Sequence, residues 1–173
     1  MKTKSDKLIK VTTAAMLAAF TCVTTVIIRI PMAGTSGYIN LGDSIVLLTA
    51  FILGGPFGAL SAGLGALLAD LLAGYAAYIP GTFAIKFLMA LTAGALQKLL
   101  LNRKVNKVAA MILSAIVGEC IMVVGYFAYE GLVLSYGSAA AFSIPGNVIQ
   151  GVICIITGVI LTMALSKRFK FTK

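Results

Sequence analysis

Long apolar segments with few charges dominate this chain and limit what it can fold into. They cover residues 9–29, 44–74, 81–98, 108–129 and 142–166. Most are close to the roughly 20 residues with which a helix crosses a bilayer. Because 60% of the 173 residues are apolar and only 11% are charged, a soluble fold could not cover these segments. The sequence therefore predicts an all-α integral membrane protein.

The positions of the basic residues indicate how the chain crosses the membrane. They gather at residues 2–10, 98–107 and 167–173, each beside an apolar segment, as the cytoplasmic ends of membrane helices do. The segment 44–74 contains the turn signal Gly54-Gly55-Pro56, and if it crosses twice, all the basic clusters lie on one face. We therefore expect a single domain, residues 1–173, of six transmembrane helices with both termini in the cytoplasm. The expected helices cover about 9–29, 44–54, 57–74, 81–98, 108–129 and 142–166.

The motifs of common enzymes are missing from the sequence. It contains no His, no P-loop and no dinucleotide-binding fingerprint, and the cysteines Cys22, Cys120 and Cys154 are too scattered to indicate a metal site. The net charge of +9 does not indicate nucleic acid, because the first two basic clusters lack interleaved aromatic residues. We expect no catalytic residues, no metal, no cofactor bound by this chain and no nucleic-acid partner.

A few ionisable residues lie at membrane depth, where a charge is costly and is most often functional. Asp70 and Lys86 lie near the outer ends of neighbouring expected helices and are predicted to form a salt bridge. Arg29 and Asp43 flank the first outer loop and are expected to pair in the same way. Glu119 lies near the middle of its helix, with no spare cation at that depth.

Polar residues toward the outer ends of the helices predict an outward-facing pocket. Glu119, Tyr126 and Glu130 lie close to one face at near-helical spacing, and Asn147 and Gln150 share a face of the last helix. Such a lining suits a small polar ring that is neutral or cationic. Alternatively, these side chains only join helices and the outer tyrosines form an interfacial belt. The candidate ligand-binding residues are Tyr38, Asn40, Asp43, Tyr75, Tyr78, Lys86, Glu119, Tyr126, Asn147 and Gln150.

Small residues recur every four positions on the first expected helix. Ala14 with Ala18, and Ala15 with Ala19, form two such stripes. Stripes of this kind let helices approach one another closely. They indicate either ordinary packing within the chain or a face that this helix offers to a partner membrane protein.

Several short motifs lie between residues 37 and 86. They are Gly37-Tyr38-Ile39-Asn40-Leu41-Gly42-Asp43-Ser44, Leu53-Gly54-Gly55-Pro56-Phe57-Gly58-Ala59, Ala69-Asp70-Leu71 with Gly74-Tyr75, and Tyr78-Ile79-Pro80-Gly81-Thr82 with Lys86. Together they resemble the substrate-binding S components of energy-coupling factor (ECF) vitamin transporters. The resemblance covers about residues 10–100, and the six-helix size agrees for the rest.

This resemblance implies a vitamin-binding subunit in the bacterial plasma membrane that is not an enzyme. It also implies partners, which are one membrane scaffold subunit and two ATPase subunits that use ATP. In S components, alanines spaced four apart on the first helix contact the scaffold. The alanines that fit this pattern here are Ala14, Ala15, Ala18 and Ala19.

The resemblance reduces the number of candidate vitamins but does not leave a single one. The motifs are most similar to S components for vitamin B6 compounds or for the hydroxymethylpyrimidine precursor of thiamine. Both ligands are small nitrogen rings with hydroxymethyl groups, which suits the lining of carboxylates and amides. The absence of Trp disfavours a pocket that depends on tryptophan stacking. Riboflavin stays open, because related S components carry it.

Functions of three other kinds remain as alternatives to a vitamin-binding subunit. A stand-alone proton-coupled carrier would use Glu119 as its proton site and would import solute without partners. A small membrane enzyme would turn over a lipid and lose activity on Glu119→Gln, whereas an accessory scaffold would bind no small molecule.

Overall fold

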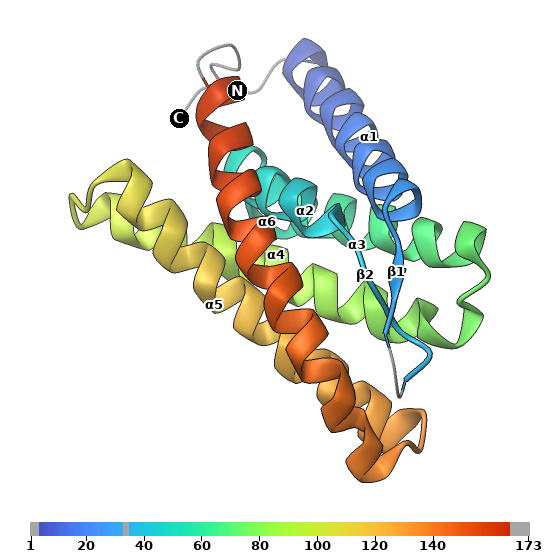
Figure 1. Cartoon of the computed structure of the whole chain (residues 1–173). Coiled ribbons are helices and arrows are strands. Elements are labelled where there is room, and N and C mark those ends of the chain that lie inside the picture. The colour runs from blue at the N-terminus through green and yellow to red at the C-terminus, as the bar shows by residue number, and fades with distance from the viewer. Residues whose placement is uncertain (1–3, 33–34, 167–173) are drawn as a thin grey trace.

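The computed structural model describes residues 4–32 and 35–166, and within them the chain is almost entirely helical (Figure 1). The long elements occupy the segments in which the sequence placed them, with an earlier start for the first helix and a later end for the fourth. They are α1 (Lys4–Ile27), α2 (Gly42–Ile52), α3 (Gly55–Ala73), α4 (Ile79–Asn102), α5 (Lys107–Ala128) and α6 (Ser143–Ser166). The predicted helical architecture is confirmed.

Local sequence signals set the breaks between these helices. Gly54 and Gly55 both adopt positive φ, 57° and 59°, and Pro56 occupies the first turn of α3. Glycine adopts this backbone region without penalty, and proline is favoured at a helix start. The chain therefore stops one helix and begins the next at this turn. At the start of α5, the Asn106 side chain accepts hydrogen bonds from the backbone N–H groups of Val108 and Ala109.

Helix α2 differs from the others in length and burial. It has 11 residues, or about 16 Å, whereas the hydrocarbon core of a bilayer is about 30 Å thick. Its residues 42–50 are all buried, and it contacts α1, α3, α4 and α6. Within the described residues, five other helical segments are long and apolar enough to cross a membrane. The chain is thus a multi-pass membrane protein, with α2 at its centre; whether α2 completes a crossing stays a prediction.

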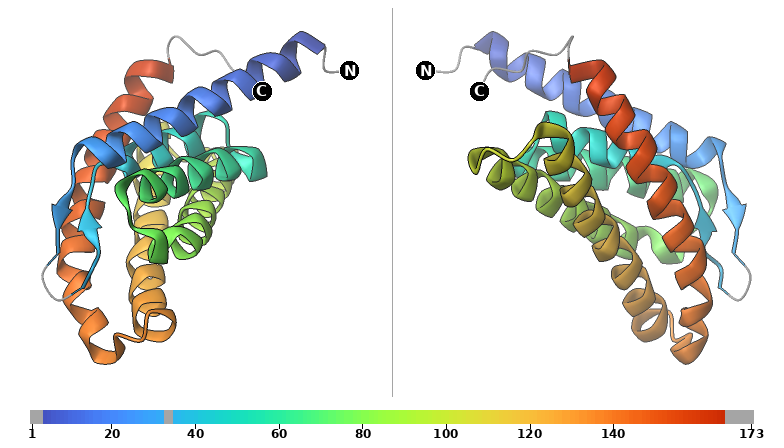
Figure 2. Two further views of the ribbon diagram at one scale, coloured as in Figure 1. Left: turned by 90° about the vertical axis from the view of Figure 1, so that its right-hand side faces the viewer. Right: turned by 60° about the vertical axis from the view of Figure 1, so that its left-hand side comes forward.

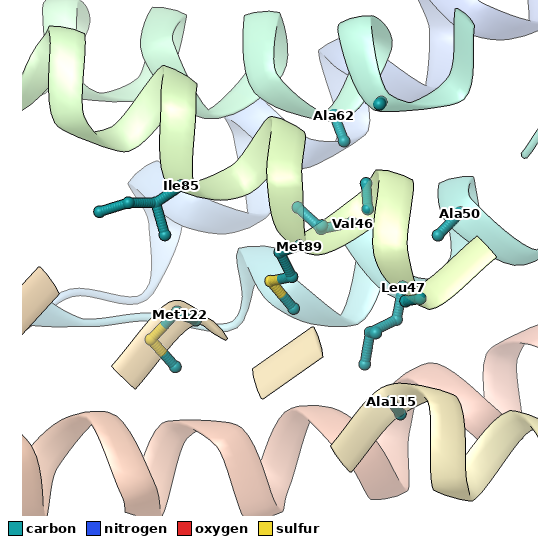
Figure 3. Packing of buried hydrophobic residues seen from close by; sticks show 11 residues of the cluster. Val46, Leu47, Ala50, Ala62, Ile85, Met89, Ala115 and Met122 are labelled. Carbon is teal, nitrogen blue, oxygen red and sulfur yellow. The ribbon is translucent and has the colours of Figure 1, made fainter. Parts of the chain in front are cut away.

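The main core lies where α2, α3, α4 and α5 meet (Figure 3). Val46 and Leu47 of α2 and Met89 of α4 are fully buried there, beside Met122 of α5. Many of the remaining core residues are alanines, which keep the backbones close.

Two short strands, which the sequence analysis did not predict, join α1 to α2. Strand β1 (Ile30–Pro31) pairs antiparallel with β2 (Tyr38–Ile39), with Ile30 opposite Ile39. Figure 2 shows this hairpin and the α5–α6 connection away from the start of α1 and the end of α6. That connection consists of a π-helical turn, η2 (Tyr129–Val133), and a 3₁₀ helix, η3 (Gly137–Phe142), while η1 (Ala76–Tyr78) precedes α4.

The described residues of the first two basic clusters lie at the end opposite the hairpin. Lys4, Lys7 and Lys10 lie in the first turns of α1, and the cluster at 98–107 surrounds the α4–α5 turn (Figure 1). The third cluster, 167–173, and Lys2 lie outside the described residues. This arrangement fits the expected topology, but which side faces the cytoplasm stays a prediction.

Candidate functional site

A pocket lined mainly by residues with polar groups lies at the hairpin end of the bundle. It contains about 320 Å³ of space between atoms, including the part that is open to solvent. Residues of the hairpin and of the adjoining ends of α3, α4, α5 and α6 form its wall. The lining residues are Met32, Gly37, Tyr38, Asn40, Asp70, Tyr78, Thr82, Tyr126, Glu130, Asn147 and Gln150.

Two tyrosine–carboxylate pairs form part of this wall. The Tyr38 hydroxyl donates to Oδ1 of Asp70 at 2.6 Å, and the Tyr78 hydroxyl donates to Oε1 of Glu130 at 2.9 Å. Burial and the Asp70 carboxylate raise the pKa of the Tyr38 hydroxyl above its ordinary value, so this hydroxyl remains a donor. The second oxygen of each carboxylate is buried and has no hydrogen bond of good geometry from the described residues, although the Thr82 hydroxyl lies near the Asp70 carboxylate.

Gln150 connects the hairpin to the helices beneath it. Its Oε1 accepts a hydrogen bond from the backbone N–H of Asn40 at 2.7 Å, and its Nε2 donates to Oδ2 of Asp43 at 2.6 Å. The Asn40 side chain in turn accepts from the backbone N–H of Gly42, where α2 begins. Gln150 therefore fixes the end of the hairpin against α2 and α6.

Lys86 lies behind the wall and pairs with Asp43, at 2.6 Å between Nζ and Oδ1. Both side chains are almost fully buried, and the ammonium lies over the ring of Tyr126, 5.1 Å from its centroid. The prediction of an Asp70–Lys86 salt bridge is wrong, because Lys86 pairs instead with Asp43 at the buried start of α2. The expected Arg29–Asp43 pair is also wrong, since Nε of Arg29 donates to the Val26 carbonyl.

The structure separates the candidate ligand-binding residues into three groups. Those on the wall are Tyr38, Asn40, Tyr78, Tyr126, Asn147 and Gln150. Asp43, Lys86 and Glu119 are buried but do not line the pocket. Tyr75 packs its ring against Tyr38, with centroids 4.5 Å apart.

Several wall residues were absent from the predicted set. Glu130 comes directly after the expected helix 108–129 and was left out of the candidate set, but the π-helical turn buries it completely. Its place four residues after Tyr126, on the same face, was the sequence signal for including it. Thr82, four residues before Lys86, contacts the Tyr126 hydroxyl at 3.0 Å. Asp70, interpreted from sequence mainly as half of a salt bridge, lies on the wall instead.

Helix α1 uses only one of its alanine stripes inside the chain. Ala14 is buried against α3, where its carbonyl accepts a hydrogen bond from Ser61 at 2.6 Å, and Ala18 lies against Gly65. Ala15 and Ala19 are exposed. The expectation that all four alanines face a partner is therefore corrected, because Ala14 and Ala18 pack within the chain.

Comparisons with known proteins agree with this architecture. A solved structure, described as the S component of a bacterial ECF transporter, superposes with a TM-score of 0.69 at 22% identity and covers 95% of this chain and 99% of that one. A likeness at this identity shows the fold alone. An uncharacterized protein of Pyrococcus woesei is 32% identical over 146 residues, which are 84% of this chain and 94% of that protein.

The match that identifies the family spans nearly the whole sequence. Residues 5–167 match the family described as "ECF-type riboflavin transporter, S component". S components are substrate-binding subunits of transporters, so this chain is not an enzyme. Because the match covers both the motifs at 37–86 and the helices that follow them, the chain belongs to the ECF-type S component family.

Proposed function

We propose that this chain captures a small nitrogen-ring vitamin at the outer face of a bacterial plasma membrane. The ligand is a vitamin B6 compound, such as pyridoxine or pyridoxamine, or hydroxymethylpyrimidine. The observation that carries this proposal is the pocket wall, on which Asp70 and Glu130 hold unused acceptor oxygens. A ring that bears hydroxymethyl or amino groups has the donors that such oxygens need.

Riboflavin is the second candidate, because the description of the matching family names it. It is a much larger molecule than a pyridoxine or a pyrimidine. Direct competition between riboflavin and pyridoxine for the purified chain distinguishes the two.

The energy for import comes, in this proposal, from a partner module of one membrane scaffold and two ATPases. The chain itself binds no cofactor, and the ATPases use the ATP. With both termini in the cytoplasm, the pocket opens outward and the basic end lies inside, in the orientation that basic clusters favour. The alternative is a stand-alone proton-coupled carrier that uses Glu119.

Uptake into proteoliposomes tests this division of labour. We expect labelled pyridoxine to enter only when the chain is reconstituted with its scaffold and ATPases and when ATP is supplied inside. A collapsed proton gradient should leave this uptake unchanged. Uptake by the chain alone that stops when the gradient collapses would instead establish the carrier.

The exposed alanines of α1 supply a specific prediction about the partner. Leucine at Ala15 and Ala19 should hold the scaffold away from the helix, since small residues permit close helix approach. We expect uptake with the module to fall at least about fivefold while ligand affinity stays within about twofold. Ala84→Leu, at an exposed alanine of α4, is the matched control and should transport normally. Equal transport by both variants would remove this face of α1 from the docking surface.

A further inference from the structure

Three buried polar atoms on the pocket wall have no hydrogen bond of good geometry among the described residues. They are Oδ2 of Asp70, Oε2 of Glu130 and Nδ2 of Asn147. These side chains are 2%, 0% and 2% exposed. Buried polar groups in native proteins are almost always satisfied, and an unsatisfied one is costly. Three such atoms around one cavity indicate a ligand that supplies the missing bonds.

The hydrogen bonds already formed on the wall also show whether each unpartnered atom needs a donor or an acceptor from the ligand. Tyr38 and Tyr78 each donate to one oxygen of the neighbouring carboxylate, so only the second oxygen is left to accept. A carboxylate oxygen accepts and never donates, whereas an amide nitrogen only donates. The ligand must therefore present donors to Asp70 and Glu130 and an acceptor to Asn147.

The charge of the wall points in the same direction. It contains two carboxylates and no Lys or Arg, because the nearby Lys86 is paired with Asp43 behind it. An anionic group in this pocket would meet like charge in a partly desolvated space, which is strongly unfavourable. A cationic or neutral donor would gain a charge-assisted hydrogen bond.

We propose that Asp70 and Glu130 determine specificity, with Asn147, by selecting a ring that bears amine or hydroxyl donors and by rejecting its carboxylate and phosphate forms. This inference rests on the proposed vitamin-binding function and adds to it the class of ligand. Pyridoxamine and pyridoxine then bind, whereas 4-pyridoxic acid and pyridoxamine 5′-phosphate do not. The free vitamin is the transported form, and its phosphate ester is excluded at the pocket.

Isosteric variants test these assignments on one series of ligands. In Asp70→Asn and Glu130→Gln the amide oxygen can still accept from Tyr38 or Tyr78, so the tyrosine pairs are kept. The amide nitrogen then stands where the unused carboxylate oxygen was, and a donor on the ligand meets a donor. Asp6→Asn, the same change at an exposed position in the first turn of α1, is the matched control.

Equilibrium binding to the purified full chain would be measured for pyridoxamine, pyridoxine, 4-pyridoxic acid, pyridoxamine 5′-phosphate and riboflavin. We expect each pocket variant to lose at least about tenfold in affinity for pyridoxamine, and less for neutral pyridoxine. The affinity for 4-pyridoxic acid relative to pyridoxamine should rise in both variants, a reversal that a merely loosened fold would not produce. The control should match the wild type throughout.

Other outcomes overturn the inference in distinguishable ways. Wild-type protein that binds the phosphate ester as tightly as the free vitamin would refute it, as would pocket variants with unchanged selectivity. Riboflavin binding that neither variant alters would also refute it, while leaving the chain a vitamin-binding subunit. Folded wild-type protein that binds none of the five ligands would refute the inference together with the proposed function.

Discussion

Lys86→Met is expected to lower the free energy of unfolding by about 3–5 kcal/mol, because it leaves a buried carboxylate without its cation. Asp43 is fully buried, and Lys86 is the basic residue paired with it among the described residues. Gln150 would still donate to one oxygen of Asp43. The neutral amide cannot offset the charge, so the loss should approach the full cost of an unpaired buried ion. The loss in free energy of unfolding is measured by unfolding the purified protein in mixed micelles titrated with a denaturing detergent.

Two further variants isolate the cause of this loss. Lys98→Met makes the same change at an exposed position of the same helix and should cost less than about 0.5 kcal/mol. In the double variant Lys86→Met with Asp43→Asn, two uncharged side chains replace the buried ion pair, so part of the lost stability should return. The ion-pair account is wrong if Lys86→Met is as stable as Lys98→Met.

Gly65→Ala is expected to destabilise the contact between α1 and α3, by about 1–3 kcal/mol. A Cβ atom at this position would collide with the Ala18 carbonyl oxygen and would lie 2.7 Å from Cβ of Thr21. The first of these is backbone, so α1 itself would have to move. The shift would also strain the Ser61 hydrogen bond to the Ala14 carbonyl. Detergent unfolding of the purified variant gives the loss.

Gly131→Ala is the control for the effect of the methyl group alone. A Cβ there would lie 3.5 Å from the nearest atom, which is ordinary van der Waals contact. This variant should stay within about 0.5 kcal/mol of the wild type. If Gly65→Ala were equally well tolerated, the close approach of α1 and α3 would not contribute to stability as described.

The helices could be predicted from sequence because their signals are local. Charge-poor segments mark the long helices, and Gly54-Gly55-Pro56 ends one helix and begins the next wherever the chain goes afterwards. The hairpin gave no comparable signal, since each strand has only two residues. The spacing of four from Tyr126 indicated the face on which Glu130 lies, whereas the π-helical turn that buries it there gave no sequence signal.

The pairing of the buried charges was beyond sequence reasoning for a different reason. Asp70 and Lys86 were matched by their depth along neighbouring helices, but depth does not say which way a side chain faces. Asp43 was placed in an outer loop, whereas it lies in the first turn of α2, which is buried at the centre of the bundle. From there it reaches Lys86, and Asp70 is left to bind Tyr38. Contacts between distant segments, rather than local sequence patterns, therefore determine which charged residues pair at the site.

The stripes of alanine illustrate the same limit. Both stripes on α1 satisfied the small-residue pattern, and only the position of α3 distinguishes them. Ala14 and Ala18 face α3, which leaves Ala15 and Ala19 on the outside. A four-residue spacing predicts that a helix face permits close approach, but not which neighbour approaches it.

Native mass spectrometry of the purified chain tests the central claim most directly. The protein would be mixed with equimolar pyridoxine, pyridoxamine, pyridoxal, hydroxymethylpyrimidine, thiamine and riboflavin. A single adduct with the mass of a B6 compound or of hydroxymethylpyrimidine is the result that the pocket predicts. A riboflavin adduct would support the assignment as a vitamin-binding subunit but would show that the proposed ligand is wrong. No adduct, from protein shown to be folded, would contradict the claim that this pocket captures a vitamin.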